Sequence, residues 1–340
     1  MECVLAIDIG GTKTSATLVT AGATMGQRVT VATPASDGPD AVLNTAAQAA
    51  RSALSSAQRV QPGLSAAAVG VGAAGMLDTS STVVGATGTF TGWVGTNVAA
   101  ELARRLALPV AACNDVDAHA LGEDWRGASA ATGYSLMVAI GTGVGAAVIR
   151  HGMVQTGAHG GAGEVGHVPS RLALDERCPC GRTGHLEAVA AGPAIAARYS
   201  RRKKLPEAAD TRTVIQRAAS GDADAAAVVD EAAGALGEAM AGMITLLDPE
   251  MVVVGGGLVH VGTRWWNVLV DTISAHLTPP VANTAVVPAA LGPDAALVGA
   301  ARYAWMNIGH DSDVLQSMSA GDTAPPHRHM ELSQQKEKGR

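Results

Sequence analysis

The sequence predicts an α/β fold of two lobes, because it contains two strand–glycine turn–strand units, one in each half of the chain. In the first unit, apolar residues 4–8 lead into a glycine turn, and the alternating run 14–19 follows. In the second unit, apolar residues 135–140 lead into another glycine turn, and the apolar run 146–149 follows. Runs of this kind, separated by glycines, predict strands joined by tight turns. We therefore expect a duplicated architecture, a β-sheet with helices in each lobe, and a cleft between the lobes.

The composition fits two lobes with a large core. The chain has 340 residues, of which 47% are hydrophobic, but only one is Phe, so Ala, Val, Leu and Ile must fill the core. The net charge of −6 argues against a nucleic-acid partner. No window predicts a membrane-spanning helix, and residues 1–4 lead into a strand without a signal-peptide pattern. We expect a cytoplasmic protein without a membrane partner.

Other segments complete the α/β pattern. The sequence predicts further strands at 27–33, 66–72, 251–254 and 284–287, and helices at 40–59, 97–108, 222–247 and 294–305. Asn97 is placed to cap its helix, and the helix that ends at residue 247 stops before Pro249, as expected. Residues 157–167 are too rich in glycine for regular structure, and residues 309–340 are expected to form a disordered tail.

Asn114 and Asp115 stand where a strand passes into a helix. The apolar segment 108–112 precedes them, and a helical pattern follows from Val116 to about Trp125. An Asp at such a junction can cap the helix. It can also act as a general base, because α/β sheets present chemistry at the carboxyl ends of their strands.

Three glycine turns follow strands and suggest a phosphate donor. Glycines let the backbone approach an anion and direct several N–H groups at it. Neither the Rossmann fingerprint nor the Walker loop fits, since both need a helix after the glycines. Taken singly, each turn could also be an ordinary hairpin or strand-to-helix turn. The candidate residues are Asp8, which could hold Mg²⁺, with Gly10, Gly11, Thr12 and Lys13, then Gly141, Thr142 and Gly143, and finally Gly255, Gly256 and Gly257.

A Cys/His knuckle, defined as residues 178–187, predicts a metal site. It contains Cys178, Cys180 and His185, and His167 precedes it in the chain. Four N and S ligands suit tetrahedral Zn²⁺ with a structural role, because no coordination position stays open. Two free thiols on a loop are the alternative. Glu164 and Glu187 flank these ligands and could bind the hydroxyls of a polyol, or could be solvated surface residues.

Together these motifs resemble the ROK family of sugar kinases, in the actin/hexokinase/Hsp70 superfamily. The resemblance runs from Asp8 to about Tyr303 and rests on the Asp8–Lys13 segment, Asn114-Asp115, Gly141-Thr142-Gly143, Glu164-Val165-Gly166-His167, the knuckle and Gly255-Gly256-Gly257. It implies a two-lobed actin-like ATPase fold of the ribonuclease H-like type. It also implies ATP, Mg²⁺ and a structural Zn²⁺.

The resemblance assigns a role to individual residues. Asp115 corresponds to the catalytic base, and the Asp8 and Gly141 turns to the segments that hold the ATP phosphates and Mg²⁺. Gly256 and Gly257 correspond to the adenosine site. The sugar contacts implied are Gly75, Asn114, Asp115, Glu164, His167 and Glu187, and the zinc ligands are His167, Cys178, Cys180 and His185.

The sequence departs from the family pattern in three places. His185 stands where the family usually has a third Cys. Phe90, in the loop before Trp93, falls on or beside the position of an Asn that binds sugar in the family. Either another residue binds those hydroxyls or the substrate differs from glucose. Asn-Asp-x-Asn-Ala is altered in its second half to Val116-Asp117-Ala118-His119.

The sequence therefore predicts transfer of the ATP γ-phosphoryl group to a hexose hydroxyl, most simply the 6-hydroxyl of glucose. The same mechanism on an N-acetyl amino sugar, fructose or a sugar-like C7 cyclitol is an alternative. A DNA-binding repressor and a catalytically silent sugar sensor are the alternatives from other classes. The small lobe is expected to contain residues 1–115 and 291–308, and the large lobe residues 116–290. The resemblance favours a homodimer or homotetramer.

Overall fold

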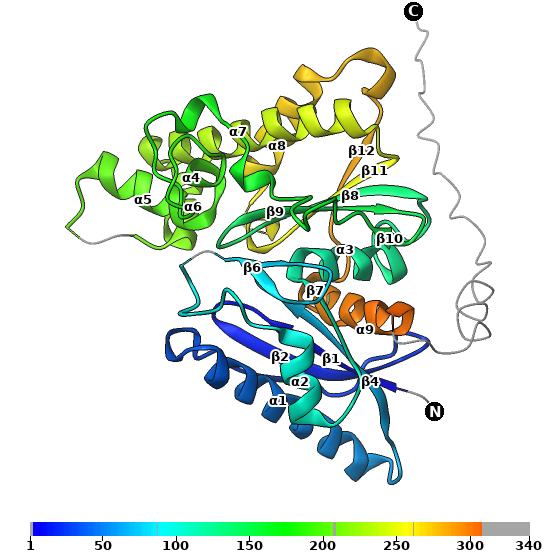
Figure 1. Ribbon diagram of the computed structural model, residues 1–340. Helices are drawn as coiled ribbons and strands as arrows, with labels where there is room; N and C mark the ends of the chain where they lie inside the picture. Colours follow the sequence, from blue (N-terminus) through cyan, green and yellow to red (C-terminus); the bar gives the residue numbers. More distant parts are fainter. Residues whose placement is uncertain (1–2, 87, 207–208, 261, 308–340) are drawn as a thin grey trace, which may run out of the picture. The chain divides into compact units, whose positions relative to one another are not determined.

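The computed structural model describes residues 3–86, 88–206, 209–260 and 262–307 (Figure 1). Within these residues, two five-stranded sheets and one two-stranded sheet form. The predicted tail, residues 309–340, lies outside the described residues.

The first sheet has the strand order β3-β2-β1-β4-β7. β1 pairs antiparallel with β2 and parallel with β4, and β4 pairs parallel with β7. Every residue of β1 except Asp8 is buried, as expected for a strand covered on both faces. The strands are β1 (Cys3–Ile9), β2 (Lys13–Thr20), β3 (Val29–Ala32), β4 (Ala66–Ala73) and β7 (Val110–Asn114). β5 (Met76–Leu77) and β6 (Val83–Gly85) form the small hairpin.

The second sheet repeats this plan with the order β10-β9-β8-β11-β12. Its first two pairs are antiparallel and its last two are parallel, as in the first sheet. The strands are β8 (Tyr134–Ile140), β9 (Val144–Arg150), β10 (Met153–Val154), β11 (Met251–Gly255) and β12 (Ala285–Pro288). The duplicated architecture predicted from the two glycine-turn units is therefore confirmed.

Helices cover both faces of each sheet. α1 (Pro39–Val60) and α2 (Val98–Leu106) pack on one face of the first sheet, in a core that includes Leu5 and Ile7. One face of the second sheet carries α7 (Ala223–Leu247) and α8 (Thr263–His276). Against α7 pack α4 (Glu187–Ala190), α5 (Gly192–Lys203) and α6 (Thr211–Ala219). Short 3₁₀ turns are η1 (Ala35–Asp37), η2 (Val165–His167), η3 (Arg171–Ala173), η4 (Gly257–His260), η5 (Pro279–Val281) and η6 (Gly292–Asp294).

Two crossing helices join the sheets: α3 (Asp115–Arg126) and α9 (Ala295–Asn307) (Figure 1). α9 packs on β4 of the first sheet, and α3 packs on β9 of the second. Their crossing is close, because a Cβ on Gly299 would lie 1.7 Å from the carbonyl oxygen of Ala118. A Cβ on Gly122 would lie 2.1 Å from the carbonyl oxygen of Ala295. Backbone contact of this kind needs glycine at both positions.

The predicted strands and helices are present, with two corrections. Asn114, not Asp115, is the N-cap of α3, because its side chain accepts from the N–H groups of Val116 and Asp117. Helices α5, α6 and α8 occupy segments for which we predicted no element. The division into lobes at residues 115/116 and 290/291 stays a prediction.

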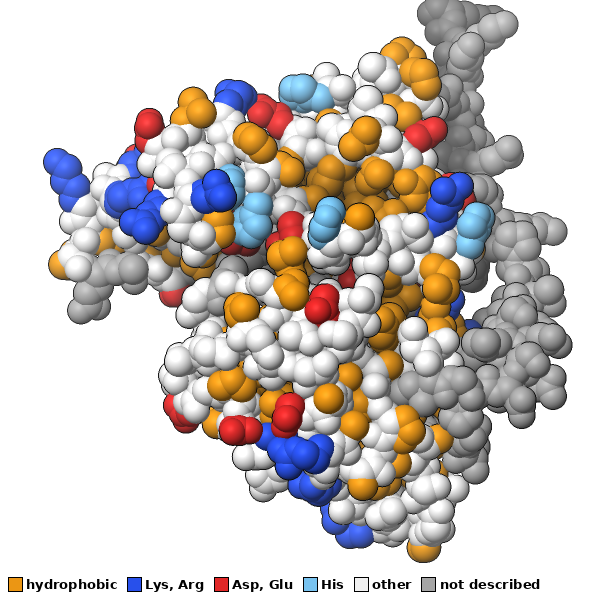
Figure 2. Space-filling model, viewed as in Figure 1, with side chains coloured by type: hydrophobic (Ala, Val, Ile, Leu, Met, Phe, Trp, Pro, Cys, Tyr) orange, Lys and Arg blue, Asp and Glu red, His pale blue; other side chains and the backbone are white. Residues whose placement is uncertain are grey.

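Charged side chains gather at several places on the face shown in Figure 2, including the end of α5. There Arg201 contacts Glu176, and Lys203 contacts Asp224 at 2.9 Å, so acidic partners offset these basic groups. Among the described residues, no helix is both long and apolar enough to cross a membrane.

Candidate active site

The turn at residues 10–13, named the first phosphate turn because the sequence predicts that it binds the ATP phosphates, is closed by hydrogen bonds from its own sheet. The Gly10 N–H donates to the Lys13 carbonyl oxygen at 3.0 Å. Thr33, just after β3, donates its backbone N–H to the Thr12 carbonyl oxygen at 3.1 Å and its hydroxyl to the Gly10 carbonyl oxygen at 2.8 Å. The Thr33 hydroxyl also lies 2.8 Å from the hydroxyl of buried Thr14. The side chains of Thr12 and Lys13 are exposed, so they are available to a ligand.

The loop before Trp93 packs against this turn. A Cβ on Gly11 would lie 2.7 Å from Cγ2 of Thr89, so only glycine fits at position 11 without a shift. Phe90 is 8% exposed, and its ring stacks on Trp93 with a centroid separation of 5.1 Å. Phe90 therefore belongs to the core of the first sheet. The effect of Phe90 on the choice of substrate stays a prediction.

Asn114 fixes the start of α3 and brings Gly75 beside it. Its side-chain oxygen accepts from Val116 at 2.7 Å and Asp117 at 3.3 Å, while its amide donates to the Gly75 carbonyl oxygen at 2.9 Å. Gly75 has φ of 108°, a conformation that favours glycine. Asp115 is the first helical residue, and its carboxylate accepts from the Val116 N–H at 3.0 Å.

Partly buried carboxylates cluster around Asp115. Burial and the nearby Asp115 charge raise the pKa of Asp8 to about 7, against a smaller opposite effect of Arg28. Burial, with the charges of Asp115 and Glu164, also raises the pKa of Asp117 to about 7. Burial raises the pKa of Asp115 as well, while His119 one turn further along α3 opposes this. Such perturbation is typical of functional sites.

The second phosphate turn, residues 141–143, is held from a different direction. The Gly141 N–H donates to the Gly143 carbonyl oxygen at 2.9 Å, and the Gly192 N–H at the start of α5 donates to the Gly141 carbonyl oxygen at 2.9 Å. The Val144 N–H, directly after the turn, donates to Oε2 of Glu187 at 2.9 Å.

The third glycine segment lies against the end of β8. Gly256 has φ of 89°, and a Cβ there would lie 2.1 Å from the carbonyl oxygen of Ile140. A Cβ on Gly257, in contrast, would meet nothing within 4 Å. The structure thus brings Gly256 next to the second phosphate turn and leaves open space beside Gly257.

His167, Cys178, Cys180 and His185 come together as predicted. Their ligand atoms all lie within 4.8 Å of one another. Sγ of Cys178 is 3.6 Å from Nδ1 of His167, and Sγ of Cys180 is 3.2 Å from Nδ1 of His185. Tetrahedral Zn²⁺ with ligands at about 2.0–2.3 Å would separate its ligand atoms by about 3.3–3.8 Å. The donor set and its spacing therefore fit zinc.

Glu164 and Glu187 connect this metal site to the rest of the candidate active site. Oε2 of Glu164 lies 3.6 Å from Nε2 of His167, the ring nitrogen that does not face Cys178. A carboxylate beside the second ring nitrogen orients a histidine ligand. Glu187 is 5% exposed, and its Oε1 lies 4.0 Å from Sγ of Cys178. It is therefore not a solvated surface residue.

The glycine-rich segment 157–167 reaches the small hairpin near Gly75. A Cβ on Gly160 would lie 2.7 Å from the carbonyl oxygen of Leu77, and one on Gly161 would lie 3.0 Å from Cε of Met76. Sequence reasoning missed this contact and also missed Thr33 and Gly192. A hydroxyl near the end of a predicted strand was a weak signal for Thr33, and the sequence offered none for Gly192.

The chain belongs to the ROK family, whose family model matches residues 4–306. A glucokinase of Thermotoga maritima is 32% identical over 320 residues, covering 90% of this chain and 98% of that protein. An N-acetylmannosamine kinase of Escherichia coli is 32% identical over 303 residues, covering 88% of this chain and 97% of that protein.

Solved structures are similar over the same range. A ROK hexokinase from Thermus thermophilus has a TM-score of 0.78 and 30% identity, covering 90% of this chain and 99% of that one. A ROK glucokinase from Streptomyces griseus, solved in complex with glucose and AMPPNP, has a TM-score of 0.75 and 28% identity, covering 90% of this chain and 100% of that one. The predicted family and class of fold are confirmed, and sugar kinase is the activity named for these relatives.

Proposed function

We propose that this protein transfers the γ-phosphoryl group of ATP to a hydroxyl of a hexose, with glucose as the preferred substrate. The observation that carries the proposal is the position of Asp115. Its carboxylate lies at the first turn of α3, in electrostatic contact with Asp8 beside the first phosphate turn. A partly buried carboxylate with a raised pKa suits a general base near neutral pH.

The remaining roles follow from the arrangement of the turns. Gly10, Gly11, Thr12 and Lys13 of the first turn and Gly141, Thr142 and Gly143 of the second would bind the ATP phosphates through backbone N–H groups and side chains. Asp8 offers the carboxylate oxygen that Mg²⁺ prefers, and the ion would neutralise charge on the phosphates. The space beside Gly257 and the close packing at Gly256 would accommodate the adenosine.

The sugar would lie where Gly75, Asn114, Asp115, Glu164, His167 and Glu187 converge. Asn114 uses its amide for Gly75 and its oxygen for α3, so it contributes mainly by holding Asp115 in place. Glu164 beside His167 offers a carboxylate that can accept hydroxyl protons. The zinc bound by His167, Cys178, Cys180 and His185 would have a structural role, because four protein ligands fill its coordination sphere.

An N-acetyl amino sugar is the second candidate substrate, since a relative named N-acetylmannosamine kinase is 32% identical in sequence to this chain. Phe90, on or beside the position of the sugar-binding Asn, supports this candidate and also fructose or a C7 cyclitol as alternatives to glucose. The complete pair of phosphate turns and Asp115 argue for catalysis over silent sensing. A homodimer or homotetramer and a cytoplasmic location stay predictions.

Sugar-dependent release of ADP from ATP and Mg²⁺ tests the proposal. The panel contains glucose, mannose, N-acetylglucosamine, N-acetylmannosamine, fructose and valiolone. We expect glucose to give the highest kcat/KM. A preference for N-acetylmannosamine would keep the mechanism and change the substrate. No ADP release with any member, while AMPPNP still binds, would contradict the proposed activity and favour a sensor.

A further inference from the structure

Glu187 forms a direct link between the Cys/His knuckle and the second phosphate turn. It is the last residue of the knuckle, and its Oε2 accepts the Val144 N–H at 2.9 Å. Its Oε1 lies 4.0 Å from Sγ of Cys178. One carboxylate thus contacts a metal-ligating side chain and the first residue after the turn, 43 positions earlier in the chain.

The packing around this carboxylate leaves it little freedom to move. A Cβ on Gly143, in the turn itself, would lie 2.7 Å from Oε2 of Glu187. A Cβ on Gly166, beside the ligand His167, would lie 3.1 Å from the same oxygen and 2.4 Å from the Val144 carbonyl oxygen. A shift of the metal-ligating segments would therefore be transmitted to the turn, because close-packed groups of this kind cannot absorb displacement.

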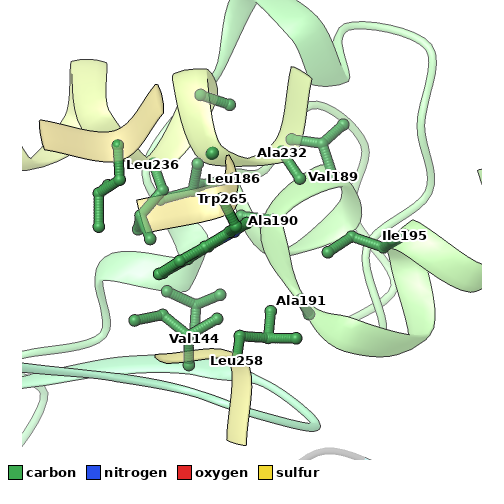
Figure 3. Packing of buried hydrophobic residues seen from close by; sticks show 14 of the residues in the cluster. Val144, Leu186, Val189, Ala190, Ala191, Ile195, Ala232, Leu236, Leu258 and Trp265 are labelled. Atoms are coloured by element: carbon green, nitrogen blue, oxygen red, sulfur yellow. The ribbon is translucent and has the colours of Figure 1, made fainter. Parts of the chain in front are cut away.

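The neighbours of the two linked residues also share a core. Figure 3 shows Leu186, Val144 and Leu258 around the indole of Trp265. Leu186 directly precedes Glu187, and Leu258 directly follows the Gly256-Gly257 segment. All four side chains are at most 5% exposed. The knuckle and the second turn consequently meet in one core, which Leu258 reaches from the segment after Gly257.

We propose that Glu187 is a positioning residue for the ATP phosphates, through which metal loading of the knuckle sets the geometry of the second phosphate turn. This inference rests on the proposed function, since it assigns the turn to ATP. It differs from the sugar-contact role because it acts on nucleotide binding when no sugar is present. The metal itself would not touch the nucleotide.

The link predicts different effects on the affinity for nucleotides with phosphates and on the affinity for adenosine. Loss of either the Glu187 carboxylate or the metal should weaken binding of a nucleotide that carries phosphates. Adenosine does not use the turn, so its affinity should stay the same. Because both changes act through one contact, their effects should not add.

The test is calorimetric titration of sugar-free protein with AMPPNP plus Mg²⁺, and separately with adenosine. We expect Glu187→Ala to raise the Kd for AMPPNP about tenfold, as for loss of a hydrogen bond to a charged group. Its adenosine Kd and bound zinc should stay at wild-type values. Chelation of zinc from the wild-type protein should give the same loss, and chelation from Glu187→Ala should add less than twofold.

Two further variants separate positioning from general damage. Glu187→Gln keeps an oxygen that can accept from Val144 and should stay within about threefold of wild type for AMPPNP. Glu250→Ala is the matched control, because Glu250 also accepts a backbone N–H, that of Gly133 at 3.2 Å, at the opposite end of β8. It should leave nucleotide affinity unchanged.

Each outcome has a distinct meaning. Unchanged AMPPNP affinity in Glu187→Ala, or losses from substitution and chelation that add fully, would overturn this inference and leave the proposed kinase function intact. An equal loss for adenosine would mean general damage to the lobe and would also overturn it. Absence of AMPPNP binding by the wild-type protein would overturn the proposed function, and this inference with it. If Glu187→Ala does not fold, Cys180→Ser, at the exposed ligand, replaces it in the same comparison.

Discussion

The two phosphate turns have the same strand plan but are supported in different ways. In both, an antiparallel pair of strands is joined by a glycine turn, β1 to β2 and β8 to β9. Thr33, from the edge of the same sheet, fastens the first turn. The second turn is fastened by Glu187 and by the start of α5, which lie outside its sheet.

The length and position of the edge strand explain this difference. β3 pairs with residues Lys13 to Ala16, directly beside the first turn. β10 has two residues and pairs with Arg150 and Ile149, at the far end of β9 from the second turn. The turn end of β9 is therefore free to receive another segment, and there the Ala146 N–H donates to the Gly163 carbonyl oxygen at 2.8 Å. In this duplicated fold, a shortened edge strand makes room for the segment that leads to His167 and the candidate metal site.

The turns also differ in charge. Asp8 stands two residues before Gly10, whereas Ala139 stands two residues before Gly141. The first turn thus has a partly buried carboxylate suited to Mg²⁺, and the second has a neutral strand end beside the knuckle. We infer that the first turn contributes a charged side chain to nucleotide binding, whereas the second contributes a backbone held in a fixed conformation.

The largest expected effect tests whether Asp115 acts as the general base without supporting either phosphate turn. We expect Asp115→Ala to lower kcat by about 10²–10⁴-fold, the usual contribution of a general base. Because the Asp115 carboxylate is hydrogen-bonded to Val116 and Asn114, at the start of α3, both turns should keep their form. AMPPNP affinity should stay within about twofold, as measured by calorimetry. A parallel loss of AMPPNP affinity would show that Asp115 supports a turn and is not an independent base.

An intermediate effect tests the difference in charge. The pKa of Asp8 is raised from its ordinary value to about 7. The native state therefore holds this proton more tightly than the unfolded chain, and stability falls as pH rises from about 4 to about 7. Asp8→Asn removes the charge, so it should melt at the same temperature as wild type near pH 4 and several degrees higher at pH 8, in buffer without Mg²⁺. Its Mg²⁺-dependent activity should be lost.

A control of opposite sign makes this prediction specific. Hydrogen bonds from the side chain of Ser80 and the backbone of Thr82 lower the pKa of Asp78, at the small hairpin. The stability that Asp78 provides is present above the pKa of the unfolded chain and is lost on acidification. Asp78→Asn should therefore lower the melting temperature at pH 8 but not at low pH. If the melting temperature at pH 8 changed in the same direction in Asp8→Asn and Asp78→Asn, the raised pKa of Asp8 would be contradicted.

Most of the duplicated fold could be predicted from the sequence, because its signals are local. Apolar runs ending in glycine marked β1, β8 and β11 within a few residues. Helices α5 and α6 were missed, since Gly192-Pro193 suggests a turn, whereas here Pro193 lies in the first turn of a helix, where proline is well tolerated. Their helical form depends on packing against α7, which a local pattern does not reveal.

The candidate site was predictable in its residue types but not in its connections. Cys178, Cys180 and two histidines have a recognisable ligand spacing, and the structure brings them together. The direction in which Glu187 points depends on a turn 43 positions away. For Phe90, the sequence placed a ring near the sugar loop, but only the fold shows it stacked on Trp93.

The smallest expected effect tests the support of the first turn. Thr33→Val keeps the shape of the side chain but removes the hydroxyl that donates to the Gly10 carbonyl oxygen and contacts buried Thr14. A lost hydrogen bond of this kind costs about 1 kcal/mol, so the melting temperature should fall by a few degrees and the KM for ATP should rise about two- to fivefold. Bound zinc and the KM for the sugar should not change, because neither depends on this turn.

Thr30→Val is the matched control, since Thr30 lies on the same strand and its hydroxyl makes an exposed contact of 3.0 Å with Ser15, further from the turn. If Thr30→Val raised the KM for ATP as much as Thr33→Val, the edge strand as a whole, and not the Thr33 hydroxyl, would support the first turn. If instead zinc chelation raised the KM for ATP in wild type and in Thr33→Val but much less in Glu187→Ala, the two turns would be shown to depend on separate supports.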